Sequence, residues 1–193
     1  MRRLLVLFAL LFALPAAAPA PGLVKVEIDT SLGPITVALE ARRAPITTAN
    51  FLRYVDQHRF DNTSFYRAAR SSGNPKMGLV QGGVDHDLRR SLLPIAHEPT
   101  TKTGLHHVDG TISMARNDPG SAMGDFFITV GPAPQLDARA GYPGYAAFGH
   151  VVSGMGVVRR ILAMPTWPGG YSLDTMGQSI RKPVKIITVK RVR

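Results

Sequence analysis

The chain of 193 residues contains no cysteine and only one tryptophan. Without cysteine the protein can form no disulfide framework, so its fold must be held together by a hydrophobic core. The same absence excludes lipid attachment through an N-terminal cysteine and removes thiolates from the ligands open to a metal site. Acidic residues are also scarce, with 13 Asp and Glu against 23 Lys and Arg, and the formal net charge is +10.

The positive charge is spread along the chain in small pairs. Arg42-Arg43, Arg89-Arg90, Arg159-Arg160 and Lys190-Arg191 lie far apart in the sequence, and no basic stripe is interleaved with aromatic residues. Proteins that bind nucleic acid usually gather Lys and Arg on one face or along one helix. We therefore expect a solvated basic surface and no nucleic-acid partner.

A long apolar run lies close to the N-terminus. Leu4–Leu14 follows the basic pair Arg2-Arg3 and precedes Pro15 and a series of small residues, an order typical of a secretory signal peptide. We expect a signal peptide over residues 1–20, with cleavage after Ala18 or Ala20; a proline follows each of these positions, which leaves the choice open.

An uncleaved membrane anchor is the alternative interpretation of this segment. A membrane-spanning helix needs about 20 apolar residues, and Leu4–Leu14 is shorter than that. We expect export to the periplasm or secretion, with no stable membrane insertion after cleavage. Residues 21–193 then form a single domain, since their number suits one hydrophobic core.

Short alternating segments dominate the rest of the chain. Leu23–Thr30 and Ile35–Leu39 alternate apolar and polar residues around a turn, which predicts a hairpin. Helical spacing occurs at Pro45–Gln57, with proline at a favoured first position, and at Gly154–Leu162. A further strand is expected from Ser64 up to the break at Ser71–Pro75, and others at Gly78–Gln81, Thr111–Ala115, Phe126–Val130, Ala146–Val152 and Val184–Val192.

These segments predict the fold class. Seven or eight short strands occur without β-α-β alternation, and two helices cannot cover both faces of a parallel sheet. We expect a mainly β protein, a closed antiparallel barrel of eight strands capped by two α-helices. Val84–Gly110 should be a long surface loop with one short strand, and the chain before Val184 should be irregular up to Lys182.

Ser64–Gly83 contains a candidate functional site. Turn-forming residues at its centre predict a hairpin that brings Arg67 and Gln81 to the same sheet face. An edge-strand arginine with its head in solvent is the alternative, because Arg is mostly exposed. Phe127 raises a related question, since it lies on the opposite strand face from Phe126 and Ile128.

The two adjacent histidines His106 and His107 suggest a metal site at first sight. Adjacent residues of a strand point to opposite faces, no cysteine is available, and no His-x-x-x-His spacing occurs. We therefore expect no metal.

Five short motifs give the chain a family resemblance. They are Phe65-Tyr66-Arg67, Gln81-Gly82-Gly83, Ser113-Met114-Ala115, Phe126-Phe127-Ile128 and Phe148-Gly149. In this order and spacing the chain resembles the cyclophilin family of peptidyl-prolyl cis-trans isomerases from about Val24 to Val192. The signal peptide and the run Gly144–Gly149 resemble the bacterial periplasmic branch of that family.

The resemblance implies an isomerase of X–Pro bonds that acts on proline-containing polypeptides without a cofactor. It implies a proline pocket on the outer surface of the barrel, with Arg67 as the catalytic arginine and Gln81 as its support. Leu79, Phe127 and Leu136 correspond to apolar pocket positions, and Ala115 to the backbone that binds the substrate strand. With Phe65 and Tyr145, which stands where many members carry histidine, the implied substrate-binding residues are Phe65, Leu79, Ala115, Phe127, Leu136 and Tyr145.

Several positions depart from the family pattern. Gly78 stands for a common phenylalanine, Arg116 for asparagine, and Gly124-Asp125 for Ser-Gln; Gln135 stands where drug-sensitive members carry tryptophan. We therefore expect weak binding of cyclosporin. The departures also keep open an alternative function, a chaperone or scaffold that binds proline peptides with weak or no isomerase activity. No apolar heptad or long exposed apolar run offers an oligomer interface, so we expect a monomer.

Overall fold

The computed structural model describes residues 22–85, 87–170 and 172–192. The signal peptide expected over residues 1–20 lies outside the described residues, as do both ends of the expected domain, 21 and 193. In the described part of the chain no helix is long and apolar enough to cross a membrane.

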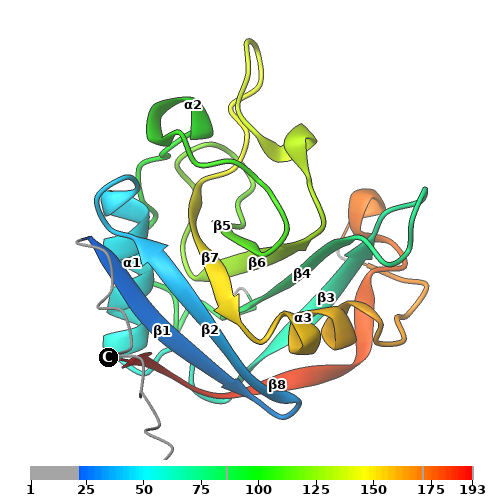
Figure 1. Cartoon of the computed structure of the whole chain (residues 1–193). Helices are drawn as coiled ribbons and strands as arrows, with labels where there is room; N and C mark the ends of the chain where they lie inside the picture. Colours follow the sequence, from blue (N-terminus) through cyan, green and yellow to red (C-terminus); the bar gives the residue numbers. More distant parts are fainter. Residues whose placement is uncertain (1–21, 86, 171, 193) are drawn as a thin grey trace, which may run out of the picture.

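Eight strands form a closed barrel in the order β1-β2-β7-β5-β6-β4-β3-β8, and β8 closes it by pairing with β1 (Figure 1). Every neighbouring pair is antiparallel, and the strands are β1 (Leu23–Thr30), β2 (Gly33–Glu40), β3 (Thr63–Arg70), β4 (Gly78–Gly83), β5 (Thr111–Met114), β6 (Asp125–Val130), β7 (Ala147–Ser153) and β8 (Ser179–Val192). The predicted mainly β, closed antiparallel barrel is confirmed.

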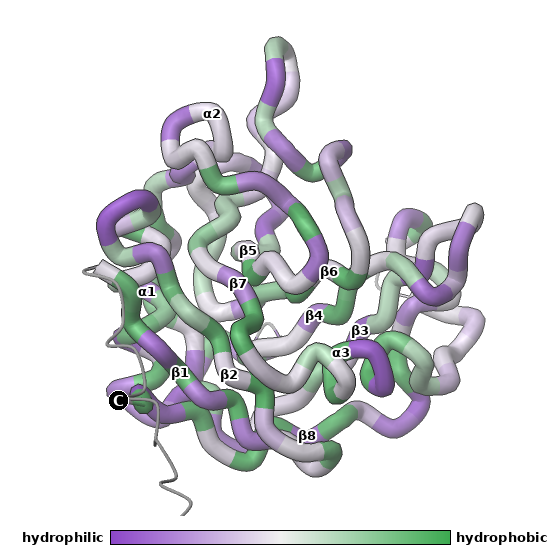
Figure 2. The backbone as a smooth tube through the Cα atoms, viewed as in Figure 1, coloured by the Kyte–Doolittle hydropathy of each residue, from purple (hydrophilic) through white to green (hydrophobic). Residues whose placement is uncertain are grey.

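The alternation of the first hairpin shows why these segments become strands. Val26 lies opposite Val37 and Ile28 opposite Ile35, and all four side chains are fully buried in the barrel. The polar residues between them, Glu27 and Thr36, are only partly buried, so the hydropathy alternates along β1 and β2 (Figure 2). Burial of one face of each strand therefore determines the register of the pair.

Within the described residues, three α-helices and two short 3-10 helices accompany the barrel. The helices are α1 (Pro45–Asp56), α2 (Thr100–Thr103) and α3 (Met155–Leu162), and the 3-10 helices are η1 (Pro134–Leu136) and η2 (Leu173–Thr175). The two predicted helices are α1 and α3, which lie on different sides of the barrel (Figure 1); the third, α2, is a single turn. Phe51 of α1 packs against Phe60, Phe126 and Phe148, so this helix contributes to the aromatic centre of the core.

Two sequence predictions about the connections are wrong. The described residues between 84 and 110 contain the helical turn α2 and no strand, and β8 begins at Ser179 instead of at Val184. The second error arises at Pro183, which has no N–H to donate to a ladder. The pairing of β3 with β8 passes from Val184 directly to Ser179 across a register shift, so the proline is tolerated inside the strand.

Candidate active site

Three neighbouring strands bring the predicted site residues into one row. Arg67 of β3 lies opposite Gln81 of β4, and Gln81 lies opposite Phe127 of β6. Residues directly opposite each other in a sheet share a face. The prediction that Arg67 and Gln81 lie on the same sheet face is therefore confirmed, and Phe127 joins them there.

A bulge in β3 adds a second aromatic residue to this row. The ladder between β3 and β4 passes from Phe65 to Arg67, so Tyr66 has no paired residue in β4. Successive residues of a regular strand point to opposite faces, yet both Tyr66 and Arg67 line the same pocket. A bulge can re-aim a side chain in this way next to a functional site.

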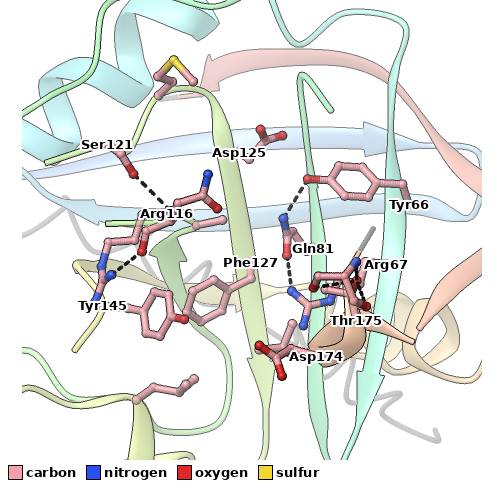
Figure 3. Close-up of a pocket in the computed structure, with 16 residues that line it drawn as sticks. Tyr66, Arg67, Gln81, Arg116, Ser121, Asp125, Phe127, Tyr145, Asp174 and Thr175 are labelled. Atoms are coloured by element: carbon pink, nitrogen blue, oxygen red, sulfur yellow. Dashed lines mark hydrogen bonds between the residues drawn. The ribbon is translucent and has the colours of Figure 1, made fainter. Parts of the chain in front are cut away.

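The Arg67 guanidinium is held by two side-chain amides. Its Nη1 donates to Oε1 of Gln81 at 2.7 Å, and its Nε donates to Oε1 of Gln178 at 2.8 Å. Gln81 in turn donates from Nε2 to the Tyr66 hydroxyl at 2.8 Å (Figure 3). Because both amide oxygens accept from the guanidinium, its plane is fixed before any substrate arrives.

Burial shapes the electrostatics of this row. It lowers the pKa of Arg67, an effect that the nearby Tyr66, Tyr145 and Asp174 oppose. Burial, and secondly the negative charge of Asp125, raise the pKa of Tyr66 above its ordinary value. Arginine stays charged in proteins, so the pocket presents a fixed cation beside a neutral phenol.

The row borders a cavity of about 620 Å³. Phe127, only 3% exposed, packs edge-on against Tyr145 with 5.4 Å between ring centroids. The residues that line the cavity are Tyr66, Arg67, Leu79, Gln81, Ala115, Arg116, Asn117, Ser121, Met123, Asp125, Phe127, Leu136, Tyr145, Ser172, Asp174 and Thr175. Seven of the eight predicted site residues are in this set; Phe65 is not.

The predicted contact of Phe65 with substrate is wrong. Its side chain is fully buried inside the barrel and packs edge-on against Phe126 at 5.7 Å. Because Phe65 precedes the bulge, it faces the core while Tyr66 and Arg67 face the pocket. The aromatic residue of this motif that reaches the cavity is Tyr66.

The segment that follows α3 supplies a wall of the pocket that the sequence did not indicate. Ser172, Asp174 and Thr175 line the cavity, and Gln178 is anchored beside β3 because Ala68 N–H donates to its backbone carbonyl at 2.8 Å. The Gln178 side chain also donates to the Asp174 carbonyl at 2.9 Å. This stretch has no hydrophobic period, so nothing in the sequence pattern linked it to Arg67.

At the other end of the pocket lies Arg116, one of the departures noted in the sequence. Its guanidinium lies over the Tyr145 ring, 4.7 Å from the centroid, and its Nε donates to the Gly144 carbonyl at 3.1 Å. Arg116 thus fixes Tyr145 and carries a second positive charge to the pocket rim.

A smaller cavity of about 380 Å³ adjoins this pocket, and Leu79 and Leu136 line both. Gln135 lines the smaller one, as does Gly78. A side chain at Gly78 would collide with the Ala69 carbonyl, 2.0 Å from the position of a Cβ atom, and its φ is +144°. The glycine is therefore required by the close approach of β3 and β4, while weak cyclosporin binding stays a prediction.

Among the described residues there is no group of three His, Cys, Asp or Glu side chains arranged to hold a metal ion. The paired histidines His106 and His107 instead both contact Asp137 through Nδ1, at 2.9 and 2.6 Å. The cavity beside Arg67 thus offers a cation, amides, hydroxyls and an apolar floor.

Comparison with known proteins assigns this arrangement to a family. Residues 23–191 match the family model described as Cyclophilin type peptidyl-prolyl cis-trans isomerase/CLD. The chain is 35% identical over 167 residues to the peptidyl-prolyl cis-trans isomerase of Acinetobacter baylyi, across 86% of this chain and 84% of that protein. It is also 35% identical over 144 residues to peptidyl-prolyl cis-trans isomerase A of Dickeya dadantii, across 73% and 72% of the two chains.

A solved structure agrees in fold. A cyclophilin type isomerase from Cryptosporidium parvum, crystallised in the presence of the dipeptide Ala-Pro, superimposes with a TM-score of 0.70 at 20% identity and covers 88% of this chain and 99% of its own. The same barrel is therefore shared across a wide sequence distance. On the family match and the bacterial relatives, this chain belongs to the cyclophilin family and is a peptidyl-prolyl cis-trans isomerase.

Proposed function

We propose that this isomerase accelerates rotation of X–Pro bonds in proteins that fold outside the cytoplasm, with Arg67 as the catalytic residue. The observation that carries the proposal is the Arg67 guanidinium, held by Gln81 and Gln178 at the edge of a pocket whose apolar floor is Phe127.

The reaction needs only a site that prefers a twisted amide. Rotation about a peptide bond faces a barrier of about 18–20 kcal/mol that arises from amide resonance. X–Pro bonds populate both isomers and exchange over tens to hundreds of seconds without catalysis. No covalent bond is made or broken, so a nucleophile, a general base and a metal are all unnecessary. The enzyme must bind the twisted bond better than either planar isomer.

The position of Arg67 suits stabilisation of the proline nitrogen, the atom whose geometry changes most as the bond twists. In the twisted state the proline nitrogen becomes pyramidal and regains a lone pair. A donor directed at that nitrogen, or at the proline carbonyl, stabilises the twisted state more than the planar ones, and the effect is larger in a water-poor pocket. Since two amides fix the guanidinium beforehand, little reorganisation is needed when the bond twists.

The apolar floor of the pocket suits the proline ring, which stays in place while the rest of the peptide rotates. Phe127, Leu79 and Leu136 line the same cavity and offer a surface for the pyrrolidine ring. Ala115 directly follows β5 and lines the same cavity, where its backbone can meet the substrate strand. The related Cryptosporidium parvum protein was crystallised with Ala-Pro, and we extend proline-peptide binding to this chain on that basis.

Charges at the rim bear on the choice of substrate. Asp174 and Arg116 both line the cavity, one negative and one positive. Peptides with a basic residue on the Asp174 side and an acidic residue on the Arg116 side should therefore bind best, and the preference should weaken with salt because the rim is open to solvent.

Export is proposed from the N-terminal pattern. The basic pair, apolar run and small residues of residues 1–20 are those of a signal peptide, and the resemblance to the periplasmic branch supports the same location. Expression of the full chain in a bacterial host, followed by fractionation and N-terminal sequencing, tests this directly. Recovery of the intact chain from the cytoplasm would contradict export.

Isomerisation of a short Ala-Pro-Phe peptide by the purified protein tests the catalytic proposal. We expect exchange well above the uncatalysed rate. A folded protein that binds the peptide without accelerating exchange would favour the alternative, a proline-binding chaperone or scaffold.

A further inference from the structure

A fully buried histidine lies directly behind the pocket floor. The His107 side chain has no solvent exposure, and its ring stacks on Phe127 with 5.8 Å between centroids and 15° between ring planes. Phe127 is thus held between His107 and Tyr145, which packs edge-on against it.

Both nitrogens of the His107 ring are occupied. Nδ1 lies 2.6 Å from Oδ1 of Asp137, and Nε2 lies 2.9 Å from the Ser113 hydroxyl. Because an ionised carboxylate only accepts, Nδ1 carries the proton of the neutral ring. Nε2 is then the acceptor for the Ser113 hydroxyl, so the neutral form satisfies every polar atom of the ring.

These bonds tie His107 to three elements of the pocket. Asp137 ends η1, which carries Leu136, and it also accepts from the His107 backbone N–H at 3.0 Å. Ser113 lies on β5 two residues before Ala115 and is paired with Phe127 across the sheet. The ring of His107 also stacks on Phe127, so His107 contacts β6 as well. A single side chain therefore connects the strands and the turn that present Phe127, Leu136 and Ala115.

The order Asp137, His107, Ser113 has the connectivity of a hydrolase triad, but it cannot act as one. Ser113 is fully buried, so no acyl carbonyl can approach its hydroxyl. His107 and Ser113 are buried behind the pocket and support its floor, so they do not themselves contact a substrate.

We propose that His107 is a positioning residue that holds Phe127 and the turn bearing Leu136 in place for the proline ring, an inference that rests on the proposed role of the pocket. The floor contacts the ring in planar and twisted states alike, so its displacement weakens binding uniformly. Loss of His107 should therefore raise KM and leave kcat nearly unchanged.

Protonation of His107 should weaken the contacts that hold Phe127 and Leu136, so substrate binding should depend on pH. The titratable groups that face His107 are Asp137, after η1, and His106 on its own segment; β5 and β6 present Ser113 and Phe127, which do not titrate in this range. Burial lowers the pKa of His107, although the Asp137 carboxylate opposes this. Protonation would turn Nε2 into a donor and deprive the Ser113 hydroxyl of its acceptor, so the pocket should loosen as the pH falls below the ordinary histidine range.

The test compares His107→Gln with His106→Gln in the full chain. His106 contacts the other oxygen of the same Asp137 carboxylate, but its side chain is 67% exposed, so it is a matched control. Two quantities are measured from pH 5 to 8: the Kd of the dipeptide Ala-Pro, by titration, and kcat and KM for an Ala-Pro-Phe peptide. Circular dichroism confirms that each variant is folded.

We expect His107→Gln to raise both Kd and KM about fivefold at pH 7.5, the size of one aromatic contact, with kcat within about twofold. His106→Gln should match the wild type, and the acid-side rise in Kd of the wild type should be absent from His107→Gln. Equal Kd values for the two variants, or a loss of kcat alone, would overturn the proposal. Because Kd is read without catalysis, an inactive wild type would overturn the proposed function and still leave the role of His107 decided by dipeptide binding.

Discussion

At the scale of single residues, the site depends on how Arg67 is oriented. A guanidinium in solvent samples many directions, whereas here Gln81 and Gln178 each accept from a different nitrogen. The Tyr66 hydroxyl accepts from Gln81 and so sets which way that amide points. The Arg67 guanidinium, the donor that we propose for catalysis, therefore lies at the end of a series of hydrogen bonds that involves β3, β4 and the segment after α3.

Removal of Gln178 tests this chain without touching the pocket floor. Gln178→Ala leaves the Arg67 Nε without its acceptor, and a hydrogen bond to a charged group contributes about 1.5–3 kcal/mol. We expect kcat/KM for a proline peptide to fall about tenfold or more, mainly through kcat. Gln57→Ala, at the exposed end of α1, is the control; an equal effect of both changes would argue against a role for Gln178.

Residue-level prediction from the sequence succeeded where pairing along a hairpin decides the outcome. Arg67 and Gln81 lie on β3 and β4, which follow each other in the chain as one hairpin, so their shared face follows from local pairing. Phe65 was misassigned because the bulge at Tyr66 leaves no trace in the hydrophobic pattern. Gln178 was missed because it is 111 residues from Arg67 and lies in a stretch without periodicity.

At the scale of elements, α1 depends on a residue far away in the sequence. Its N-cap, Ala44, supplies no side-chain cap. Glu98, only 2% exposed, takes that role: its carboxylate accepts from the backbone N–H of Ile46 at 3.2 Å and of Thr47 at 2.7 Å. A carboxylate at a helix N-terminus also complements the helix dipole, so the loop before α2 and the start of α1 stabilise each other.

Glu98→Ala should therefore destabilise the protein. The backbone N–H groups of Ile46 and Thr47, the second of which is buried, would lose a charged acceptor. We expect the free energy of unfolding to fall by about 2–3 kcal/mol. The measurement is urea unfolding followed by circular dichroism. Glu27→Ala serves as the comparison, since it removes only a partly exposed ion pair with Lys190, worth about 0–1 kcal/mol; equal losses in the two variants would refute the capping role.

Element-level prediction was accurate for the segments with a clear period. The strands that bury one face and the helices α1 and α3 were found because alternation or helical spacing continues over several residues. The single turn α2 is too short to show a period, and it was predicted as loop and strand. The start of β8 at Ser179 was not predicted, because a proline such as Pro183 is typical of a strand boundary. In the structure, the register shift between β3 and β8 allows Pro183 to lie inside the strand.

At the scale of the whole molecule, the residues that stabilise the fold and the residues that line the pocket lie on opposite faces of the barrel wall. Its interior is filled by the core, including Phe51, Phe65 and Phe126, while the pocket lies on the outer face of β3, β4 and β6. Closure by β8 on β1 completes the barrel. Substitutions that abolish activity at Arg67 should therefore leave the fold intact, and core substitutions should unfold the protein before they change the chemistry.

The buried histidine makes global stability depend on pH. The pKa of His107 is lowered in the folded protein from its ordinary value of 6.5, so the unfolded chain takes up this proton first. The contribution of neutral His107 to the free energy of unfolding is complete above about pH 6.5. It is lost as the pH falls toward the lowered pKa of the folded protein. The pKa of Asp137 is also lowered, although burial acts against this, because hydrogen bonds from His107 and His106 prevail; its contribution is lost only below its ordinary value of 3.8.

We therefore expect the Tm to decrease on acidification from pH 7.5 to 5, and to decrease less in His107→Gln. Differential scanning calorimetry at fixed ionic strength measures both. An equal slope in the two proteins would show that His107 is not the group that titrates.

The central claim is that Arg67 stabilises the twisted X–Pro bond, and kcat/KM of Arg67→Ala tests it most directly. With an Ala-Pro-Phe peptide, we expect a loss of about 10²–10³-fold, or about 3–4 kcal/mol of transition-state stabilisation, at an unchanged Tm. Arg181→Ala, which removes an exposed arginine stacked on Trp167, should keep wild-type activity. If Arg67→Ala were folded and nearly as active as the wild type, Arg67 would have no part in the mechanism.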